Sequence, residues 1–222
     1  MPATVALTFD QSVTACTVAK DILAARGMVA TFYCEPGVVG VAGEITKSQM
    51  ILLKYLGWEI GAYTGSNMVT MVTSNRDQAF DKLKSLSVDM AALGFEVETI
   101  APNQRAWNGG LADMCRGRFK GVRVVDDFSA VQSYPIPDPL WVKKGGTASW
   151  SSGDTVASLS AQLDSLIASG GLWVPVIHNV GSSPNGLTVS TDVFAGFMDY
   201  LKTKRDSGLV RVVRFVDALS PP

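Results

Sequence analysis

One pattern recurs along the chain: a segment with the apolar spacing of an amphipathic helix ends at a glycine, and a short run of β-branched and aromatic residues follows. A glycine directly after a helix supplies the left-handed backbone conformation that ends it. Five such units are visible, and their glycines are Gly27, Gly57, Gly94, Gly170 and Gly208. Together with an opening apolar strand at Val5–Phe9, they predict an α/β domain whose strands are parallel.

Boundary residues refine this picture. Residues that favour helix N-caps stand at the start of four expected helices, namely Thr46, Ser74, Asp154 and Thr191. Roughly seven or eight strands are expected, a number that favours a closed barrel over an open sheet. Pro175 lies inside the expected strand Leu172–His178 and predicts a bulge or a sheet edge there. The proline- and glycine-rich stretch Asp127–Gly153 is expected to form a loop region over the open face.

Length and charge narrow the classes of function. The chain has 222 residues, which fits a single domain over residues 1–222. Its formal net charge is −1 and it has no basic run, so nucleic acid is not expected as a partner. No apolar stretch reaches about 18 residues, so no transmembrane helix is expected. The first residues also lack the pattern of a signal peptide.

The residue counts limit metal chemistry. The chain has one histidine, so it cannot supply the several imidazoles of a common zinc site. Cys16, Cys34 and Cys115 lie far apart without a C-x-x-C pair, and the first two fall in expected core elements. Asp126 and Asp127 are adjacent on an expected strand, so their side chains point to opposite faces and do not chelate one ion together. Any metal here would need oxygen ligands around at most one imidazole; no metal and no other cofactor is predicted once the resemblance described below is included.

Polar side chains follow the expected strands at their carboxyl ends, where α/β domains carry their sites. These side chains are Asp10, Tyr63, Asn67, Asn103, Asp126 and His178. Asp10 and His178 form the one acid/base pair in this set that could work near neutral pH. Each also has a structural interpretation, a helix cap or loop carboxylate for Asp10 and a backbone-bonded imidazole for His178. Without further information the structural interpretations are favoured.

Tryptophans offer a second kind of candidate, because an indole can stack on a sugar ring or fill a core. Trp58 and Trp173 lie in strand patterns and are expected in the core. Trp107 and Trp150 lie in loop sequence, where sugar binding and packing are about equally expected. No Gly-x-Ser-x-Gly elbow, P-loop or dinucleotide fingerprint occurs, so those classes of enzyme have no support.

Several of these segments resemble, in order, the motifs of the polysaccharide deacetylase family, the NodB homology domain. Leu7–Gln11 resembles its opening Thr-Phe-Asp-Asp motif, and Gly27–Tyr33 resembles the strand that follows. Gly57–Asn67 resembles the family's Gly-His-Glu-Ile-Gly-Asn-His-Thr-x-x-His, and Trp173–Asn179 resembles the late strand that ends in His-Asp. The closing stretch 193–210 also fits, so the resemblance covers nearly the whole chain.

The resemblance implies that the chain folds as an irregular (β/α)7 barrel. It also implies the family's usual activity, the removal of acetyl groups from N- or O-acetylated sugars. In that family one Asp and two His hold a divalent metal, a second Asp acts as base, and a late His protonates the leaving group. Asp10 stands at the base position and His178 at the acid position. The metal-ligand positions carry Gln11, Tyr63 and Asn67, whose neutral oxygens lack the charge and the imidazoles that hold zinc.

The arginine that orients the base in this family is also missing from its usual place. Pro102 keeps the proline of the Arg-x-Pro motif, but Ala101 or Ile100 stands where the arginine is expected. Arg105 lies nearby but is offset along the chain. The resemblance therefore does not predict what orients Asp10.

These observations favour a carbohydrate-recognising domain on a deacetylase fold that has lost its metal site. Its expected partner is a polysaccharide or acetylated glycan, contacted by Gln11, Tyr63, Asn67, Asn103, Trp107 and Asp126. By analogy, such a domain is expected outside the cell or on a virion, as part of a surface or phage tail assembly. Two alternatives stay open: an active esterase or deacetylase that uses Asp10 and His178 without a metal, and a structural subunit of an oligomer.

Overall fold

The computed structural model describes residues 2–65, 68–103, 106–125, 132–143, 149–182 and 186–220. The strands are β1 (Ala3–Val5), β2 (Thr8–Asp10), β3 (Thr31–Cys34), β4 (Glu59–Tyr63), β5 (Thr99–Ala101), β6 (Gly121–Val124), β7 (Val142–Lys143), β8 (Leu172–Trp173), β9 (Val176–Ile177), β10 (Asn179–Val180), β11 (Thr188–Val189) and β12 (Val210–Val212). The α-helices are α1 (Lys20–Ala24), α2 (Lys47–Tyr55), α3 (Met68–Ser74), α4 (Arg76–Ala92), α5 (Gly109–Cys115), α6 (Val156–Ser169), α7 (Thr191–Asp206) and α8 (Phe215–Ala218). A π-helical turn, Ala15–Ala19, precedes α1, and 3-10 turns occupy Pro36–Val38 and Pro139–Trp141.

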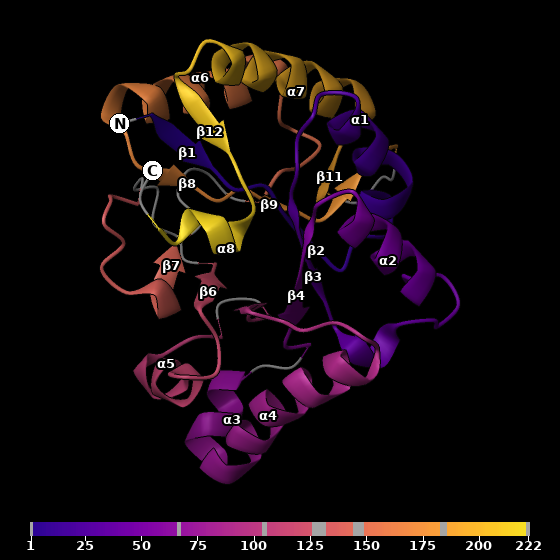
Figure 1. Cartoon of the computed structure of the whole chain (residues 1–222), viewed down its shortest axis with the longest axis vertical. Helices are drawn as coiled ribbons and strands as arrows, with labels where there is room; N and C mark the ends of the chain where they lie inside the picture. The colour runs from indigo at the N-terminus through magenta and orange to yellow at the C-terminus, as the bar shows by residue number, and fades with distance from the viewer. Residues whose placement is uncertain are drawn as a thin grey trace.

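Parallel strands lie at the centre of the molecule, with helices around them (Figure 1). Seven of them form one sheet in the order β7-β6-β5-β4-β3-β2-β9, and a second sheet has the order β12-β1-β8. The chain passes directly from β1 to β2 and from β8 to β9. Each of these two connections leads from the three-stranded sheet into the seven-stranded sheet, so the two sheets together enclose one interior. The predicted α/β barrel of parallel strands is confirmed.

Side chains alternate between the two faces of each strand and form two buried clusters. The outer cluster, between strands and helices, includes Phe9, Phe32 and Ile60 together with Phe194 of α7. The second cluster faces the inside of the barrel, and we call it the lumen cluster. Its members are Ala6, Tyr33, Tyr63, Ala101, Val142, Leu172, Val174, Phe215 and Ala218.

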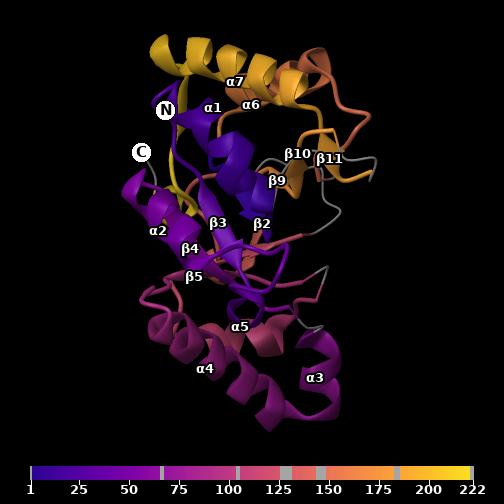
Figure 2. The same ribbon diagram turned by 90° about the vertical axis from the view of Figure 1, so that its right-hand side faces the viewer.

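Helices cover the outside of the barrel in groups. Figure 2 shows α6 and α7 side by side at one end of the molecule, with α3, α4 and α5 at the other and α1 and α2 between them. An amphipathic helix buries residues spaced by three and four along one face. In α7 those residues are Phe194, Phe197, Met198 and Leu201.

Four tryptophans belong to the outer cluster, namely Trp58, Trp107, Trp150 and Trp173. Trp58 is 3% exposed, and its ring centroid lies 5.3 Å from that of Phe9. Trp150 meets Phe197 edge-on at 5.3 Å and lies 6.1 Å from Trp173. The predicted core role of Trp58 and Trp173 is confirmed, and for Trp150 the structure selects packing over sugar stacking.

The short helix α8 closes the end of the barrel where the strands begin. Its first two N–H groups donate to side chains that open two strands: Phe215 N to Thr31 Oγ1 at 2.8 Å, and Val216 N to Glu59 Oε2 at 2.9 Å. The Glu59 carboxylate also accepts hydrogen bonds from the hydroxyls of Thr31 and Thr99. Burial raises the pKa of Glu59 above its ordinary value, while these hydrogen bonds oppose the rise. Both oxygens of this buried carboxylate are therefore satisfied by neutral donors.

Helix starts are predicted correctly in type and less well in position. Thr46 caps α2 as predicted. Its hydroxyl accepts a hydrogen bond from the backbone N–H of Gln49, and the Gln49 side-chain oxygen accepts one from the backbone N–H of Thr46. The caps predicted at Ser74, Asp154 and Thr191 are wrong by one residue, since the N-caps are Asn75, Thr155 and Ser190. Each true cap is also a favoured capping residue with extended backbone, so residue type alone does not choose between neighbours.

The expected strand around Pro175 is interrupted there. It splits into β8 and β9, and the Pro175 carbonyl accepts from both the backbone N–H and the hydroxyl of Thr8, at 3.1 and 2.7 Å. In the stretch expected to be loop, the structure adds the two-residue strand β7, paired with β6. A strand this short carries no readable alternation, which is why the pattern missed it.

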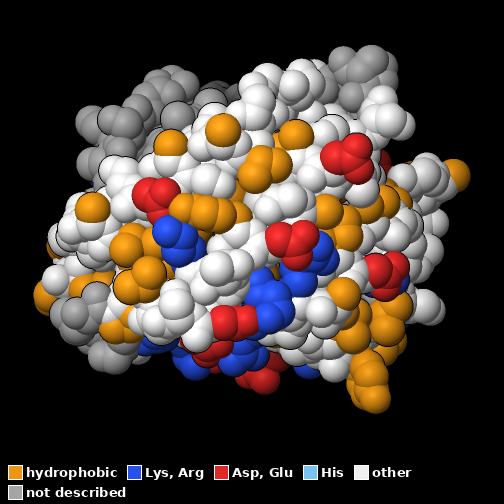
Figure 3. All heavy atoms as spheres, turned by 90° about the horizontal axis from the view of Figure 1, so that it is seen from above, with side chains coloured by type: hydrophobic (Ala, Val, Ile, Leu, Met, Phe, Trp, Pro, Cys, Tyr) orange, Lys and Arg blue, Asp and Glu red, His pale blue; other side chains and the backbone are white. Residues whose placement is uncertain are grey.

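Charges of both signs are interspersed on the surface of the molecule. Figure 3, which looks onto the end formed by α6 and α7, shows acidic and basic side chains side by side. Arg26 pairs with Asp199 at 2.8 Å, and Lys204 pairs with Asp164 at 2.8 Å. Within the described residues, no helix combines the length and the apolar character needed to cross a bilayer.

Candidate functional site

A pocket of about 560 Å³ opens where the barrel strands end. Its lining residues are Asp10, Tyr63, Asn103, Val125, Ser149, His178 and Leu187. Four of the polar residues singled out in the sequence therefore meet at one place, although they are far apart along the chain. Two others, Asn67 and Asp126, lie outside the described residues.

Asp10, the last residue of β2, is held by a buried arginine. Arg123 of β6 donates through Nη2 to Asp10 Oδ1 across the barrel interior. The Arg123 side chain is fully buried, and Asp10 is 6% exposed. A charge-assisted hydrogen bond in such a dry setting fixes the carboxylate strongly.

Two further donors of this guanidinium have no partner. Arg123 Nε and Nη1 are buried and make no hydrogen bond to any residue that the structure describes. The guanidinium instead lies over the ring of Tyr33, 5.2 Å from its centroid, where the face of the ring attracts a cation. Burial raises the pKa of the Tyr33 phenol well above its ordinary value, so this ring stays neutral beneath the charge. Arg123 is thus committed to Asp10 and Tyr33 and to no other described residue.

Arg123 is a site residue that the sequence patterns did not predict, although the sequence carries a signal for it. Arg123 stands alone as a charged residue in the buried strand Gly121–Val124, and charges are rarely buried without a partner. Its partner Asp10 is 113 residues away along the chain, so spacing could not reveal the pair.

Tyr63, at the end of β4, is tied to the loop that follows β5. Its hydroxyl donates to Asn103 Oδ1 at 2.9 Å. Asn103 in turn donates from its backbone N–H to Thr64 Oγ1 at 2.9 Å and from its side-chain nitrogen to the Gly65 carbonyl at 3.2 Å. This loop contact holds two polar side chains in the pocket wall.

Gln11 is not among the residues that line the pocket. Its backbone has φ +50°, a left-handed conformation that a non-glycine residue rarely adopts. Its side-chain nitrogen donates to Glu35 Oε2 at 2.9 Å. The Glu35 carboxylate fills the space beside Gly65, where a Cβ would come within 1.9 Å of Glu35 Oε1. Gln11 and Glu35 therefore form a hydrogen-bonded pair at the edge of the site.

The described residues do not fit the Asp–His–His metal set that the resemblance implies. Gln11 donates its amide to Glu35, and Tyr63 donates its hydroxyl to Asn103, so both side chains are engaged with protein acceptors. No group of three or more His, Cys, Asp or Glu side chains within the described ranges is placed to hold a metal ion. Neutral amide and phenol groups are poor ligands for a zinc-like cation.

Trp107 does not reach the pocket. Its indole is 8% exposed, and Nε1 donates to the Leu140 carbonyl at 2.9 Å. A ring held in this way packs the barrel wall and offers almost no face to a sugar. The expectation that Trp107 contacts glycan therefore finds no support in its position.

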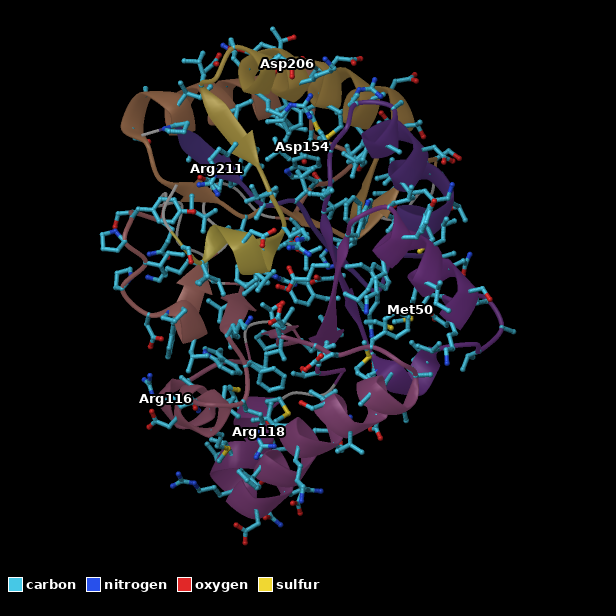
Figure 4. The ribbon with its side chains drawn as sticks, in the orientation of Figure 1. Met50, Arg116, Arg118, Asp154, Asp206 and Arg211 are labelled. Atoms are coloured by element: carbon cyan, nitrogen blue, oxygen red, sulfur yellow. The ribbon has the colours of Figure 1, made fainter. Side chains whose placement is uncertain are left out.

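The cysteines are core residues. Cys16, Cys34 and Cys115 are free and buried, and burial raises the pKa of each thiol to about 12. Cys34 lies 3.9 Å from the sulfur of Met50, which Figure 4 labels on α2 beside the barrel. Neutral buried thiols are poor nucleophiles, so they take no part in the site.

Comparisons with known proteins place the fold. No protein-family model matches the sequence, and no curated protein matches it. Among solved structures, the peptidoglycan deacetylase PdaC from Bacillus subtilis matches with a TM-score of 0.58 and 14% identity, over 98% of this chain and 90% of that one. A family 4 carbohydrate esterase from Streptomyces lividans, in complex with acetate, matches with a TM-score of 0.59 and 12% identity, over 94% and 90%.

A third match is a mutant of a CE4 family pseudoenzyme, with a TM-score of 0.60 and 16% identity, covering 99% of this chain and 68% of that one. A mutant of a CE4 family pseudoenzyme with restored enzymatic activity matches with the same TM-score and 17% identity. The chain has the polysaccharide deacetylase fold, an irregular (β/α)7 barrel. Within that fold class, it is similar both to deacetylases and to a pseudoenzyme.

Proposed function

We propose that this chain is a carbohydrate-recognising domain on the polysaccharide deacetylase fold, without the deacetylase metal site. The observation that carries the proposal is the engagement of Gln11 and Tyr63, two of the three residues at ligand positions, with protein acceptors beside an open pocket. A pocket of about 560 Å³ that is lined by polar side chains and has other residues in place of the metal ligands is suited to binding.

The chemistry of the pocket wall suits a sugar. Asp10, Asn103, Ser149 and His178 offer hydrogen-bond donors and acceptors for hydroxyl or amide groups. Val125 and Leu187 add an apolar part to the wall, and Leu187 is 48% exposed. Sugars present both kinds of surface, polar edges and a face of C–H groups, so a mixed wall of this type can orient one.

The similar structures suggest the class of glycan. One is described as a peptidoglycan deacetylase and another as a carbohydrate esterase. We therefore propose a polysaccharide or acetylated glycan as the partner. The proposal includes a place outside the cell or on a virion, in a surface or phage tail assembly, where such polymers are met.

Binding of the chain to an array of acetylated and non-acetylated bacterial glycans tests this function. Asn103→Ala and Tyr63→Phe are expected to weaken binding, because they remove groups from the pocket wall. Tyr134→Phe is the matched control: its hydroxyl also donates to a protein acceptor, the Ala218 carbonyl at 2.8 Å, but it does not line the pocket. Absence of binding to any glycan, or equal losses in Tyr63→Phe and Tyr134→Phe, contradicts the proposal.

A second candidate is a metal-free esterase, and the observation that favours it is the presence of Asp10 and His178 in one pocket. Asp10 would take a proton from a water molecule as its oxygen bonds to the acyl carbon. His178 would give a proton to the sugar oxygen or nitrogen as the acyl bond breaks, so that acetate and the free sugar leave. Tyr63 could donate to the developing oxyanion only by giving up its bond to Asn103.

Release of acetate from acetylated glycans separates the two candidates. The esterase predicts turnover that a chelator leaves unchanged and that Asp10→Asn abolishes. Turnover that appears only with added zinc contradicts the metal-free mechanism. Binding without turnover supports the recognition domain.

A structural subunit is a third candidate, favoured by exposed apolar side chains on α2. Tyr55 is 87% exposed and Ile51, one turn earlier, is 52% exposed. Light scattering measures the oligomeric state. A chain that stays monomeric at all accessible concentrations contradicts this candidate. A defined oligomer that dissociates in Tyr55→Ser supports it.

A further inference from the structure

The bond between Arg123 and Asp10 crosses the interior of the barrel. Three strands, β5, β4 and β3, separate β6 from β2 in the sheet order. The arginine therefore reaches its partner through the lumen, above the ring of Tyr33. A side chain as large as that of Arg123 needs space in the lumen. Protein interiors are close-packed, so the residues of the lumen cluster have to leave that space open.

Two small residues supply that space. A Cβ at Gly61 would lie 2.5 Å from the Tyr33 ring, so only glycine leaves room for this ring beside β4. Thr99 pairs with Gly121 and Ile100 with Val122, so the next step of the same register sets Ala101 beside Arg123. Alanine at that position leaves room for the neighbouring guanidinium. Gly61 and Ala101 together form the passage in which Arg123 lies.

The unpartnered donors argue against a purely structural arginine. A buried group kept for stability alone is normally fully hydrogen-bonded, as Glu59 is at the other end of the barrel. Arg123 instead leaves Nε and Nη1 unpaired, and it uses its one hydrogen-bonding contact on a residue that lines the pocket. Unfavourable features that persist in this way cluster at functional sites.

We propose that Arg123 is the positioning residue of the pocket: it holds Asp10 through Oδ1 and so presents Oδ2 to a bound ligand as a fixed acceptor. The part that concerns a ligand rests on the proposed carbohydrate function, and the part that concerns Asp10 does not. Positioning from β6 depends on Gly61 and Ala101, because a larger side chain at either place closes the passage.

The test uses three variants and a matched control in the full chain. Arg123→Met removes the charge, and Arg123→Lys keeps the charge but not the planar fork of donors. The double variant Ala101→Arg with Arg123→Ala moves the guanidinium to the neighbouring strand. Glu59→Gln is the control, since it alters the other buried carboxylate without touching Asp10.

The first readout is the carboxyl ¹³C chemical shift of Asp10, which needs no ligand. It is expected to move in Arg123→Met and Arg123→Lys, to return toward the wild-type value in the double variant, and to stay unchanged in Glu59→Gln. An unmoved signal in Arg123→Lys overturns the proposal. This holds even if Arg123→Met does not fold, because the lysine variant keeps the buried charge.

The second readout is the affinity for the glycan identified by the array. Arg123→Lys is expected to bind about tenfold or more weakly, the loss expected when one charged hydrogen bond is misplaced. Glu59→Gln is expected to bind as the wild type does. Equal affinity in Arg123→Lys and wild type overturns the role in recognition. If no variant and no wild-type chain binds a glycan, the proposed function fails, while the chemical shift still decides the role of Arg123.

Discussion

Each end of the barrel contains a buried carboxylate, and the two carboxylates differ in the hydrogen-bond donors that surround them. Glu59, where the strands begin, is surrounded by neutral donors that also anchor α8. Asp10, where the strands end, faces one charged donor whose other N–H groups are unpaired. The first arrangement satisfies both carboxylate oxygens, whereas only Oδ1 of Asp10 accepts a hydrogen bond from a described residue.

Under the proposed function, this difference distinguishes the end that anchors α8 from the end that would bind a ligand. Neutral donors around a buried carboxylate give a closed network that stabilises the position of α8. An ion pair with unsatisfied donors stabilises less than its geometry suggests, because desolvation offsets the attraction. A pocket lies beside each carboxylate: Asp10 lines the pocket where the strands end, and Glu59 lines another, of about 460 Å³, where the strands begin. The two ends therefore differ in how the carboxylate is held, not in whether a pocket is present. If the comparison holds, changes at the two ends should differ in size and in kind.

The largest effect is expected from Arg123→Met. It leaves Asp10 as an uncompensated buried charge, so the free energy of unfolding should fall by about 3–5 kcal/mol in urea denaturation. The double variant Arg123→Met with Asp10→Asn should recover part of this loss, since no charge stays buried. A double variant as unstable as the single one breaks the comparison.

Alanine substitutions at two glycines test the same comparison between the two ends of the barrel. In Gly61→Ala the new Cβ meets the buried Tyr33 ring at 2.5 Å and the Thr99 carbonyl at 3.0 Å, so unfolding should become easier by about 1–3 kcal/mol. Gly121→Ala is the matched change near α8, where the Cβ meets Leu219 Cδ1 at 2.6 Å. Leu219 is only partly buried and can rotate away, so its loss should be smaller. Thermal melting of both variants gives the order, and a reversed order contradicts the tight passage around Arg123.

Glu59→Gln should cost about 1–2 kcal/mol, less than the arginine change, because only neutral hydrogen bonds are disturbed. The released group is the Val216 N–H at the start of α8, so faster amide exchange should be confined to that helix. Exchange that also rises around Asp10 would show that the two ends are coupled.

The smallest expected effect is on pH dependence. Burial raises the pKa of Glu59 above its ordinary value of 4.5, so between the two values the folded chain holds a proton that the unfolded chain has lost. Stability from this group is complete below the unfolded pKa and is lost as the pH rises through the folded pKa. Urea titrations at several pH values from 4.5 upward should show this decline in the wild type and its absence in Glu59→Gln.

Much of the fold could be predicted because it follows local rules. The glycine after each helix and the spacing of Phe194, Phe197 and Leu201 in α7 are visible in short windows of sequence. The interruption at Pro175 follows from its missing N–H. The strand β7 and three of the N-cap positions were not predicted correctly, because two-residue strands and neighbouring capping residues give no distinct pattern in the sequence.

The site was predicted in part. Asp10, Tyr63, Asn103 and His178 could be gathered by one rule, that parallel strands end on the same side. Arg123 could not be assigned a role, because its meaning depends on a contact across the lumen. The burial of Trp107 likewise depends on Leu140, a residue in a distant 3-10 turn. Contacts between elements far apart in the chain carry the information that a single sequence lacks.

The pairing of Gln11 with Glu35 also restricts how this site could change. Gln11→Asp alone, the simplest step toward a metal ligand, would replace a hydrogen-bond donor with a second carboxylate against Glu35. Glu35 would have to change first, and while its carboxylate stays, position 65 must remain glycine, because a Cβ there would lie 1.9 Å from Glu35 Oε1. Mutational routes toward a metal centre are therefore ordered and epistatic. A library that varies positions 11, 35 and 65 together with the ligand positions 63 and 67 should succeed where single reversions fail.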